Sequence, residues 1–148
     1  MQKVVSLLYR APELLMKTNL YSCPIDIWSV GCVIAELKLR RKIFLGDSEI
    51  GQLFAIFRVL GTPSDKEWRG LSKLQNFHQR FPIWKSVLDE LFVNDPVVEL
   101  LKGMFTYHPA ERFDIKMCLL HPYFKTMSKS QKKNESKSHY EIWDSMGI

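Results

Sequence analysis

The side chains best suited to chemistry in this 148-residue chain lie in two short runs near its beginning. The first run is Tyr9–Glu13 (YRAPE), and the second, Asp26–Ser29 (DIWS), begins thirteen residues after Glu13. A guanidinium and a carboxylate match in a two-bond fork, which can anchor one segment to another or recognise a ligand. The residue types in these runs therefore favour anchoring and recognition.

The other reactive side chains form no site with a characteristic spacing. The three cysteines, Cys23, Cys32 and Cys118, make no metal-binding or redox pair, and their odd number argues against a disulfide framework. The four histidines share no metal-ligand spacing. We therefore expect no metal site, and a reducing, intracellular setting.

Charge and hydropathy narrow the class of partner. The net charge of +5 is spread along the chain, and the C-terminal lysines are interleaved with Ser, Asn and Glu, so we expect solvation rather than nucleic-acid binding. A membrane span needs about 20 apolar residues. The nearest stretch, Ile27–Leu37, contains Glu36 and is followed by Lys38, so we expect no membrane association.

A long helix is predicted from Pro24 to near Lys38. Proline suits a first helical turn, and Asp26 adds a favourable charge there. Apolar residues cover nearly the whole circumference of this helix, which is typical of a buried helix.

A second helix is predicted to begin with Asp47 as its N-cap and to stop at Gly61. Its apolar stripe consists of Ile50, Leu53, Phe54, Phe57 and Leu60. Residues 62–94 are rich in turns and hold four aromatic residues expected to anchor onto the core: Trp68, Phe77, Phe81 and Trp84.

Two more helices complete the expected fold. One runs from Asp95-Pro96 to about Thr106, and a short one begins near Asp114 and is ended by His121-Pro122. No strand pattern is present, so the expected fold class is mainly α.

In order and spacing, the motifs resemble those of the cyclin-dependent kinase family, close to its cell-cycle members. The matching motifs are VVSLLYRAPE at 4–13, DIWS at 26–29, GDSEI at 46–50, LGTP at 60–63, and Arg112 with His121-Pro122. The resemblance covers residues 4–124 and implies a protein-kinase-like C-lobe fragment without an N-lobe. We expect a partial kinase domain over residues 1–124, from the end of the activation segment, and a polar, basic tail over residues 125–148.

The resemblance implies structural roles for four residues. Glu13 and Arg112 would form a buried ion pair that ties the activation segment to the C-lobe. Asp26 would be a core anchor that accepts backbone N–H groups of the catalytic loop, and Trp28 is most simply a core residue. Because the sequence holds no catalytic loop, the Asp26 oxygens would go unmatched unless water reaches them.

A substrate-binding set is implied at Val4, Val5, Ser6 and Arg10. In relatives a valine carbonyl here turns toward the arginine, so a substrate N–H would lose its acceptor and proline, which has no N–H, is preferred. Val4 and Val5 could instead be simple packing residues. Ser6 stands where the family usually has Thr, and we expect its hydroxyl to be solvated.

A docking patch for a small regulatory adapter is implied at Glu49, Ile50 and Gln52. Ile50 also fits the helical stripe, so packing in the core is an equal alternative for this residue. The chain departs from the family at Lys17, where relatives usually have glycine.

The catalytic parts of the family are missing from the sequence. Phosphoryl transfer needs a Gly-rich loop, a strand lysine, a catalytic-loop Asp and Asn, and a metal-binding Asp. None of the motifs G-x-G-x-x-G, V-A-I-K, H-R-D or D-F-G occurs. We therefore expect no catalytic residue and no cofactor site in this chain, although full-length relatives use MgATP.

The resulting hypothesis is an inactive fragment of a cyclin-dependent, proline-directed Ser/Thr kinase, a family that phosphorylates protein Ser/Thr-Pro sites in cell-cycle control. The alternative is a non-catalytic module that docks regulatory adapters or substrates. Expected partners are protein substrates and a small adapter, with a cyclin only for a full-length form, in the nucleus, the cytoplasm or both. Without neighbours from the missing region, the helix from Pro24 should expose apolar surface and cause poor solubility or oligomerisation.

Overall fold

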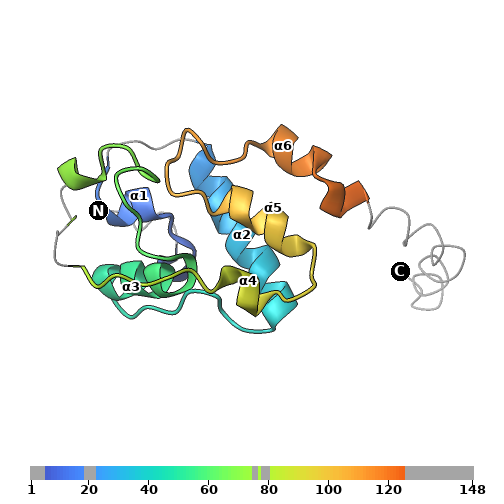
Figure 1. The fold of residues 1–148 in the computed structure, drawn as a ribbon, viewed down its shortest axis with the longest axis horizontal. Helices are drawn as coiled ribbons and strands as arrows, with labels where there is room; N and C mark the ends of the chain where they lie inside the picture. Colours follow the sequence, from blue (N-terminus) through green and yellow to red (C-terminus); the bar gives the residue numbers. More distant parts are fainter. Residues whose placement is uncertain (1–5, 19–22, 75–76, 78–80, 126–148) are drawn as a thin grey trace, which may run out of the picture.

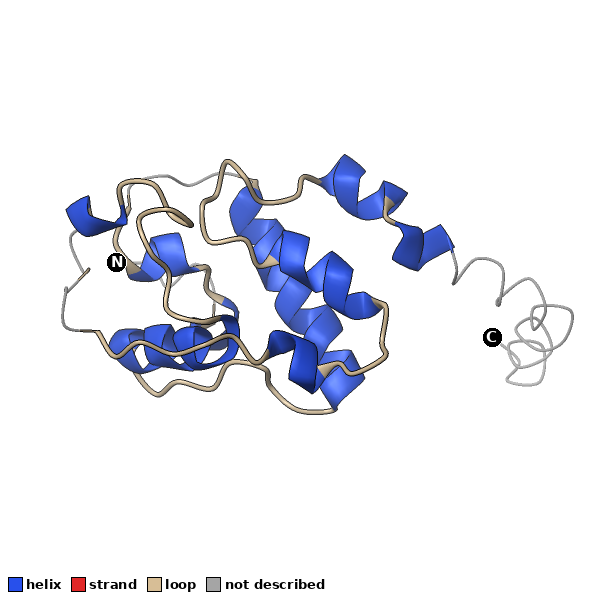
Figure 2. Ribbon diagram, viewed as in Figure 1, coloured by secondary structure: helices blue, strands red, loops and turns tan. Residues whose placement is uncertain are grey.

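The computed structural model describes residues 6–18, 23–74, 77 and 81–125. Within these ranges the chain is helical and has no strand (Figure 2). In chain order the 3-10 helices (η) and α-helices are η1 (Leu7–Tyr9), α1 (Pro12–Leu15), α2 (Pro24–Leu39), α3 (Glu49–Leu60), η2 (Leu71–Lys73), α4 (Leu88–Leu91), α5 (Val97–Met104) and α6 (Ile115–Leu120). The predicted mainly α fold class is confirmed.

Helix α2 lies at the centre of the fold and is its longest helix (Figure 1). Pro24 occupies its first position and Asp26 its first turn, and Arg40 ends it in a left-handed conformation with φ 54°. Helix α5 packs along α2, whereas η1 contacts both α2 and α3, and α1 packs on α3. The segment around η1 therefore lies between the two longest helices.

Helix α2 is not buried all round as its apolar pattern alone predicts, whereas the expectation that it exposes apolar surface is confirmed. Its buried side chains include Ile25, Ile27, Trp28, Cys32 and Ala35. On another side, Val30, Val33 and Leu37 are 49%, 45% and 74% exposed. The physical reason is that the described part of the chain packs α2 on one side only, so the apolar residues on its other side face solvent.

The start of α3 also differs from the prediction in one residue. Ser48, rather than Asp47, is the N-cap, because its Oγ accepts the Gly51 N–H at 3.0 Å. Asp47 supports the cap, since its Oδ1 accepts the Ser48 hydroxyl at 3.1 Å. At the other end Gly61, with φ 87°, stops the helix as predicted, in a conformation that a residue with a side chain rarely adopts.

The buried face of α3 is formed by Gln52, Leu53, Ile56 and Phe57. Ile50 is exposed, so the alternative that it packs in the core is wrong. The buried face thus includes the polar Gln52, which the predicted apolar stripe does not contain.

Aromatic residues from distant segments form the centre of the core. The Trp28 ring stacks on Phe44 and meets Phe105 edge-on, with ring centres 5.7 Å and 5.0 Å apart. Trp68 is buried and stacks on Tyr107 at 6.1 Å. The expected anchoring by the turn-rich segment is thus confirmed at Trp68, and the partly buried Phe77, Phe81 and Trp84 also pack on the core.

The last two helices begin close to their predicted positions. Asp95 Oδ1 accepts the Val97 N–H at 3.0 Å at the start of α5, and Asp114 caps α6 by accepting the Met117 N–H at 2.7 Å. Helix α5 ends at Met104, two residues before the predicted Thr106. The short elements η1, α1, η2 and α4 are not predicted by the pattern, because each spans only three or four residues.

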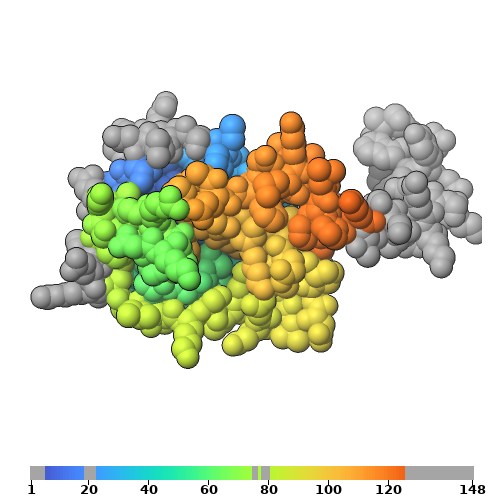
Figure 3. Space-filling view, turned by 45° about the horizontal axis from the view of Figure 1, so that its top comes forward, coloured from blue at the N-terminus to red at the C-terminus, as the bar shows by residue number. Residues whose placement is uncertain are grey.

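Segments far apart in the sequence lie side by side on the surface. Figure 3 shows the residues around α1 (blue) next to the segment that follows α3 (green) and to the residues that follow α5 (orange). The start of the described chain is therefore held by residues about one hundred positions later, and the contacts responsible lie beside α1.

Replacing Lys17 by glycine is expected to stabilise the fold. Lys17 follows Met16, the C-cap of α1, and has φ 55°, a conformation that costs a residue with a Cβ about 1–2 kcal/mol. Glycine relieves this strain but increases the entropy of the unfolded chain, so we expect Lys17→Gly to raise the free energy of unfolding by about 0.5–1 kcal/mol in urea titrations.

The matched control for this substitution is Asn94→Gly. Asn94 also has a left-handed φ, of 60°, but asparagine tolerates this conformation well. We expect Asn94→Gly to change the free energy of unfolding by only a few tenths of a kcal/mol. Equal effects at the two positions would contradict the strain argument.

Candidate functional site

The Glu13 carboxylate and the Arg112 guanidinium form a two-bond ion pair beside α1. Arg112 Nη1 donates to Glu13 Oε1 at 2.7 Å, and Nη2 donates to Oε2 at 2.8 Å. The Arg112 side chain is 0% exposed and the Glu13 side chain is 2% exposed. Pro12 at the first position of α1 places Glu13 in the first helical turn, where a carboxylate is favoured.

The other three N–H groups of Arg112 bind backbone carbonyls. Nε donates to Thr106 O at 3.0 Å, Nη1 to Pro24 O at 2.8 Å and Nη2 to Tyr107 O at 3.3 Å. The guanidinium also lies over the Trp28 ring, 5.1 Å from its centre. Since a guanidinium has five N–H donors, every donor of Arg112 has an acceptor.

This arrangement makes Arg112 a joint between three segments. Its acceptors belong to α1, to the first residue of α2 and to the residues that follow α5. Burying a charge costs several kcal/mol unless the charge is paired and hydrogen-bonded, as it is here. Removing one partner therefore leaves an uncompensated buried charge.

A second set of contacts holds η1 and Arg10 against the start of α3. Arg10 Nη1 donates to Glu49 Oε1 at 3.0 Å. Gln52 is fully buried, and its amide donates to Leu8 O at 3.2 Å while it accepts the Gly46 N–H at 2.9 Å. The structure thus brings Arg10 of the expected substrate-binding set against Glu49 of the expected adapter patch, and Gln52 of that patch against η1.

A third contact joins Tyr9 to the end of α2. Tyr9 donates its hydroxyl to Glu36 Oε2 at 2.7 Å, and Lys42 Nζ donates to both Glu36 oxygens at 2.8 and 2.9 Å and to the Tyr9 hydroxyl. The hydrogen bond from Lys42, followed by that from Tyr9, lowers the pKa of the Glu36 carboxyl, and the Glu36 bond raises the pKa of Lys42. Ser29 adds a bond from its hydroxyl to Tyr9 O at 3.0 Å.

Sequence reasoning missed this Tyr9–Glu36–Lys42 cluster. Tyr9 lies 27 residues from Glu36 and 33 from Lys42, so no local spacing links the three side chains. The charge of Glu36 within the apolar run of α2 was the one available signal, because a charged residue in such a run needs a partner.

The remaining expected site residues belong to the substrate-binding set and to the adapter patch. Val4 and Val5 lie outside the described residues, and Ser6 is exposed. Glu49 and Ile50 are both exposed, and Glu49 is paired with Arg10. Of the adapter patch, Gln52 is the correction: its buried side chain binds η1 and cannot contact a partner.

Asp26 is a second correction, since it is exposed and is not a core anchor in the structure. Its position explains this: Asp26, Val30, Val33 and Leu37 follow one another at helical spacings of four, three and four residues, and all four are exposed. Trp28, by contrast, is fully buried, and its indole N–H has no acceptor within the described part of the chain.

The described residues offer no group of three or more His, Cys, Asp or Glu that could hold a metal ion. None of the helices in the same part of the chain has the length and apolarity needed to cross a membrane.

Comparison with known proteins gives consistent matches. The protein kinase domain model matches residues 1–124. Cyclin-dependent kinase B1-1 of Arabidopsis thaliana is 45% identical over 132 residues, which is 87% of this chain and 42% of that protein. Cyclin-dependent kinase B2-1 of Oryza sativa subsp. japonica is 43% identical over 130 residues, 86% of this chain and 40% of that protein. The chain thus spans about two fifths of the length of these curated relatives.

Removing the Arg112 side chain is expected to be strongly destabilising. Arg112→Ala leaves the buried Glu13 carboxylate and three backbone carbonyls without their donors, so we expect the free energy of unfolding to fall by about 3–5 kcal/mol in denaturant titrations. A loss well under 1 kcal/mol would reject the pair as a structural lock. The control is Lys38→Ala, which removes a partly exposed ion pair with Asp95 and should cost no more than about 1 kcal/mol.

The Tyr9–Glu36–Lys42 cluster is expected to make stability depend on pH in the acid range. The folded-state pKa of Glu36 is lowered, so its ionised form stabilises the fold above the ordinary glutamate pKa of about 4.3, and this contribution is lost as the pH falls through the folded pKa. The difference in unfolding free energy between wild type and Glu36→Gln should be constant between pH 7 and about pH 5 and should shrink below about pH 4.3.

Lys42→Gln provides the independent check of this pH dependence. It removes the main donor that lowers the Glu36 pKa, so the unfolding free energy should depend less on pH in the same acid range. A difference between wild type and Glu36→Gln that stays unchanged down to pH 3 would contradict the argument.

Proposed function

This chain belongs to the protein kinase family, and we propose that it supplies the substrate-presenting part of the C-lobe of a cyclin-dependent, proline-directed Ser/Thr kinase. The observation that carries the proposal is the buried Glu13–Arg112 fork, because it fixes the YRAPE segment against α2 and α5. The likeness to cyclin-dependent kinases over most of the chain supports the same assignment.

The role proposed for Arg10 is to shape the place where the residue after the target Ser or Thr would lie. Glu49 holds the Arg10 guanidinium at 3.0 Å, and Gln52 holds the preceding η1 segment, so the arginine is fixed from the side of α3. An arginine placed to attract a neighbouring backbone carbonyl takes that acceptor from a substrate N–H. Proline has no N–H, so it alone loses nothing there, which supports a preference for Ser/Thr-Pro sites.

The chain as given is proposed to transfer no phosphate. A site for MgATP needs phosphate-cradling glycines, a lysine and metal-binding carboxylates, and the sequence holds none of the corresponding motifs. The carboxylates of the described residues form no metal-binding group either. The residues present therefore do not fit the nucleotide, and MgATP is assigned only to full-length relatives.

The exposed face of α2 supports the view that further kinase-domain residues cover it. Asp26, Val30, Val33 and Leu37 lie together on this face, with a carboxylate at one end and apolar side chains along the rest. The carboxylate could accept hydrogen bonds from the free N–H groups of a backbone loop, and the apolar side chains could pack against an apolar segment beside that loop. In this proposal catalysis belongs to a longer polypeptide that includes both parts.

A second candidate function is a non-catalytic module that docks a small regulatory adapter. It is favoured by Ile50, an exposed apolar side chain in the first turn of α3. The two candidates differ in one expectation: a self-sufficient module should melt as a monomer in one cooperative transition, whereas a chain that lacks the cover of α2 should self-associate through its apolar face.

The partners proposed for the family role are protein substrates and a small adapter, and a cyclin for a full-length form. Nucleic acid and membranes are not proposed as partners, and the proposed location is intracellular, in the nucleus, the cytoplasm or both.

The absence of nucleotide chemistry is tested by titrating the purified chain with MgATP in a calorimeter and by a phosphotransfer assay with a Ser-Pro peptide. We expect no heat of binding at micromolar nucleotide and no labelled peptide. Binding at micromolar affinity, or any transfer by the purified chain, would overturn this part of the proposal.

A further inference from the structure

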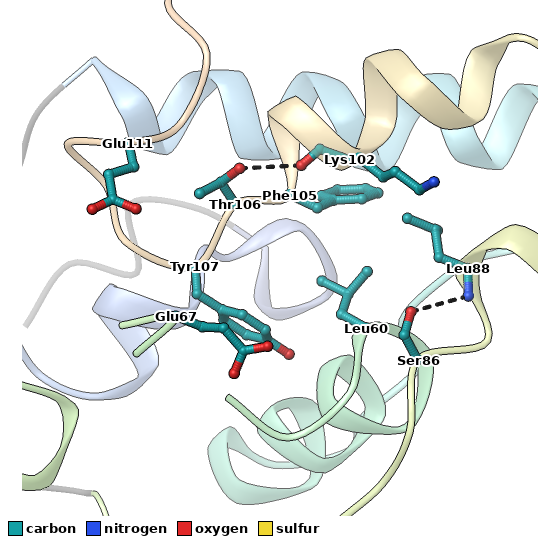
Figure 4. A pocket seen from close by; sticks show the side chains of 9 residues that line it. All are labelled: Leu60, Glu67, Ser86, Leu88, Lys102, Phe105, Thr106, Tyr107 and Glu111. Atoms are coloured by element: carbon teal, nitrogen blue, oxygen red, sulfur yellow. Dashed lines mark hydrogen bonds between the residues drawn. The ribbon is translucent and has the colours of Figure 1, made fainter. Parts of the chain in front are cut away.

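A cavity of about 290 Å³ lies between the end of α3, the start of α4 and the end of α5. Figure 4 shows Leu60, Leu88 and Phe105 converging on it, with the ring of Tyr107 at its lower side. Leu88, Phe105 and Tyr107 are otherwise buried, so the cavity reaches the side of the core. Two of its lining residues, Thr106 and Tyr107, take part in the Arg112 contacts, but only through their backbone carbonyls.

The three hydroxyl groups in the cavity wall already donate to backbone carbonyls. The Tyr107 hydroxyl donates to Gly61 O at 2.6 Å, and the Thr106 hydroxyl donates to Lys102 O at 3.1 Å. The Ser86 hydroxyl also donates to a backbone carbonyl, at 3.3 Å. The wall therefore offers a ligand mainly apolar and aromatic surface.

The charges around the cavity are predominantly negative. Glu67 and Glu111 lie at one end of it, and Lys102 lies at the other (Figure 4). Lys102 is paired with Asp89 at 2.6 Å and with Glu99 at 2.8 Å, so its charge is already compensated. The Glu111 carboxylate makes no hydrogen bond or ion pair with any other described residue. An incoming anion is thus disfavoured, and a cation is favoured.

We propose that this cavity binds an arginine side chain of a protein partner. The aliphatic stem of the arginine packs against Leu60 and Phe105, and its guanidinium lies at Glu67 and Glu111, beside the Tyr107 ring. A guanidinium suits this place because it combines a charge with a flat face and a fork of donors for carboxylates.

The size of the cavity decides against larger ligands. Small-molecule sites typically have volumes of about 300–1,000 Å³, so this cavity is at their lower limit and has room for a side chain rather than for a nucleotide. A bare metal ion is disfavoured too, because the lining supplies only two carboxylates without a cationic partner, those of Glu67 and Glu111. Glu67 Oε2 already accepts the N–H and the hydroxyl of Ser64, both at 2.8 Å, so only its Oε1 remains open to a ligand.

The test uses the full 148-residue chain and the capped tripeptide Ala-Arg-Ala, with binding followed by NMR shifts of the Phe105 and Tyr107 rings. The matched probe is Ala-citrulline-Ala, which keeps the shape of arginine and removes its charge. We expect saturable shifts with the arginine peptide and affinity at least about fivefold weaker with the citrulline peptide. This binding needs no phosphate transfer, so its failure would leave the proposed function intact.

Three charge-neutral variants locate the site. Glu67 and Glu111 are exposed, so Glu67→Gln and Glu111→Gln should each weaken binding of the arginine peptide about two- to fivefold, the range of one exposed ion pair. Glu90→Gln removes a charge from the exposed side of α4, away from the cavity, and should leave the affinity unchanged. Equal binding of the two peptides, equal losses in all three variants, or no saturable shift in protein whose fold is verified by its melting curve would each overturn the proposal.

Discussion

The structure depends above all on one guanidinium. Arg112 is fully buried, and its five N–H groups are divided between a carboxylate in α1, a carbonyl at the start of α2 and two carbonyls after α5. No apolar side chain could replace it, because a substitute would leave the Glu13 charge and these carbonyls without donors. The segment that carries Arg10 is thereby fixed at its C-terminal end, and the Glu49 and Gln52 contacts fix it from α3.

Helix α2 has two different faces, and one of them packs against the Arg112 guanidinium. One face carries Trp28, which packs under the Arg112 guanidinium and among the rings of Phe44 and Phe105. The opposite face, from Asp26 to Leu37, is exposed and mostly apolar. A single helix thus stabilises the YRAPE segment on one side and presents, on the other, an exposed and mostly apolar surface.

The sequence predicts the long helices well because their signals are local. A proline at the first turn of α2, the glycine after α3 and the aspartate that caps α6 each act within one turn. The same patterns could not distinguish the buried face of α2 from its exposed face, because apolar residues occur on all sides of this helix. The contacts of Tyr9 with Glu36 and of Gln52 with Leu8 were equally inaccessible, because these residues lie 27 and 44 positions apart and only the tertiary fold brings them together.

The most direct test of the central role of Arg112 is amide hydrogen exchange of the chain and of Arg112→Lys, measured under conditions in which both remain folded. A lysine keeps the charge but cannot supply five donors to three segments. Protection should fall together in residues 11–16, 24–28 and 105–112, although they are far apart in the sequence. If only amides next to position 112 exchange faster, Arg112 is not the joint that holds these segments together.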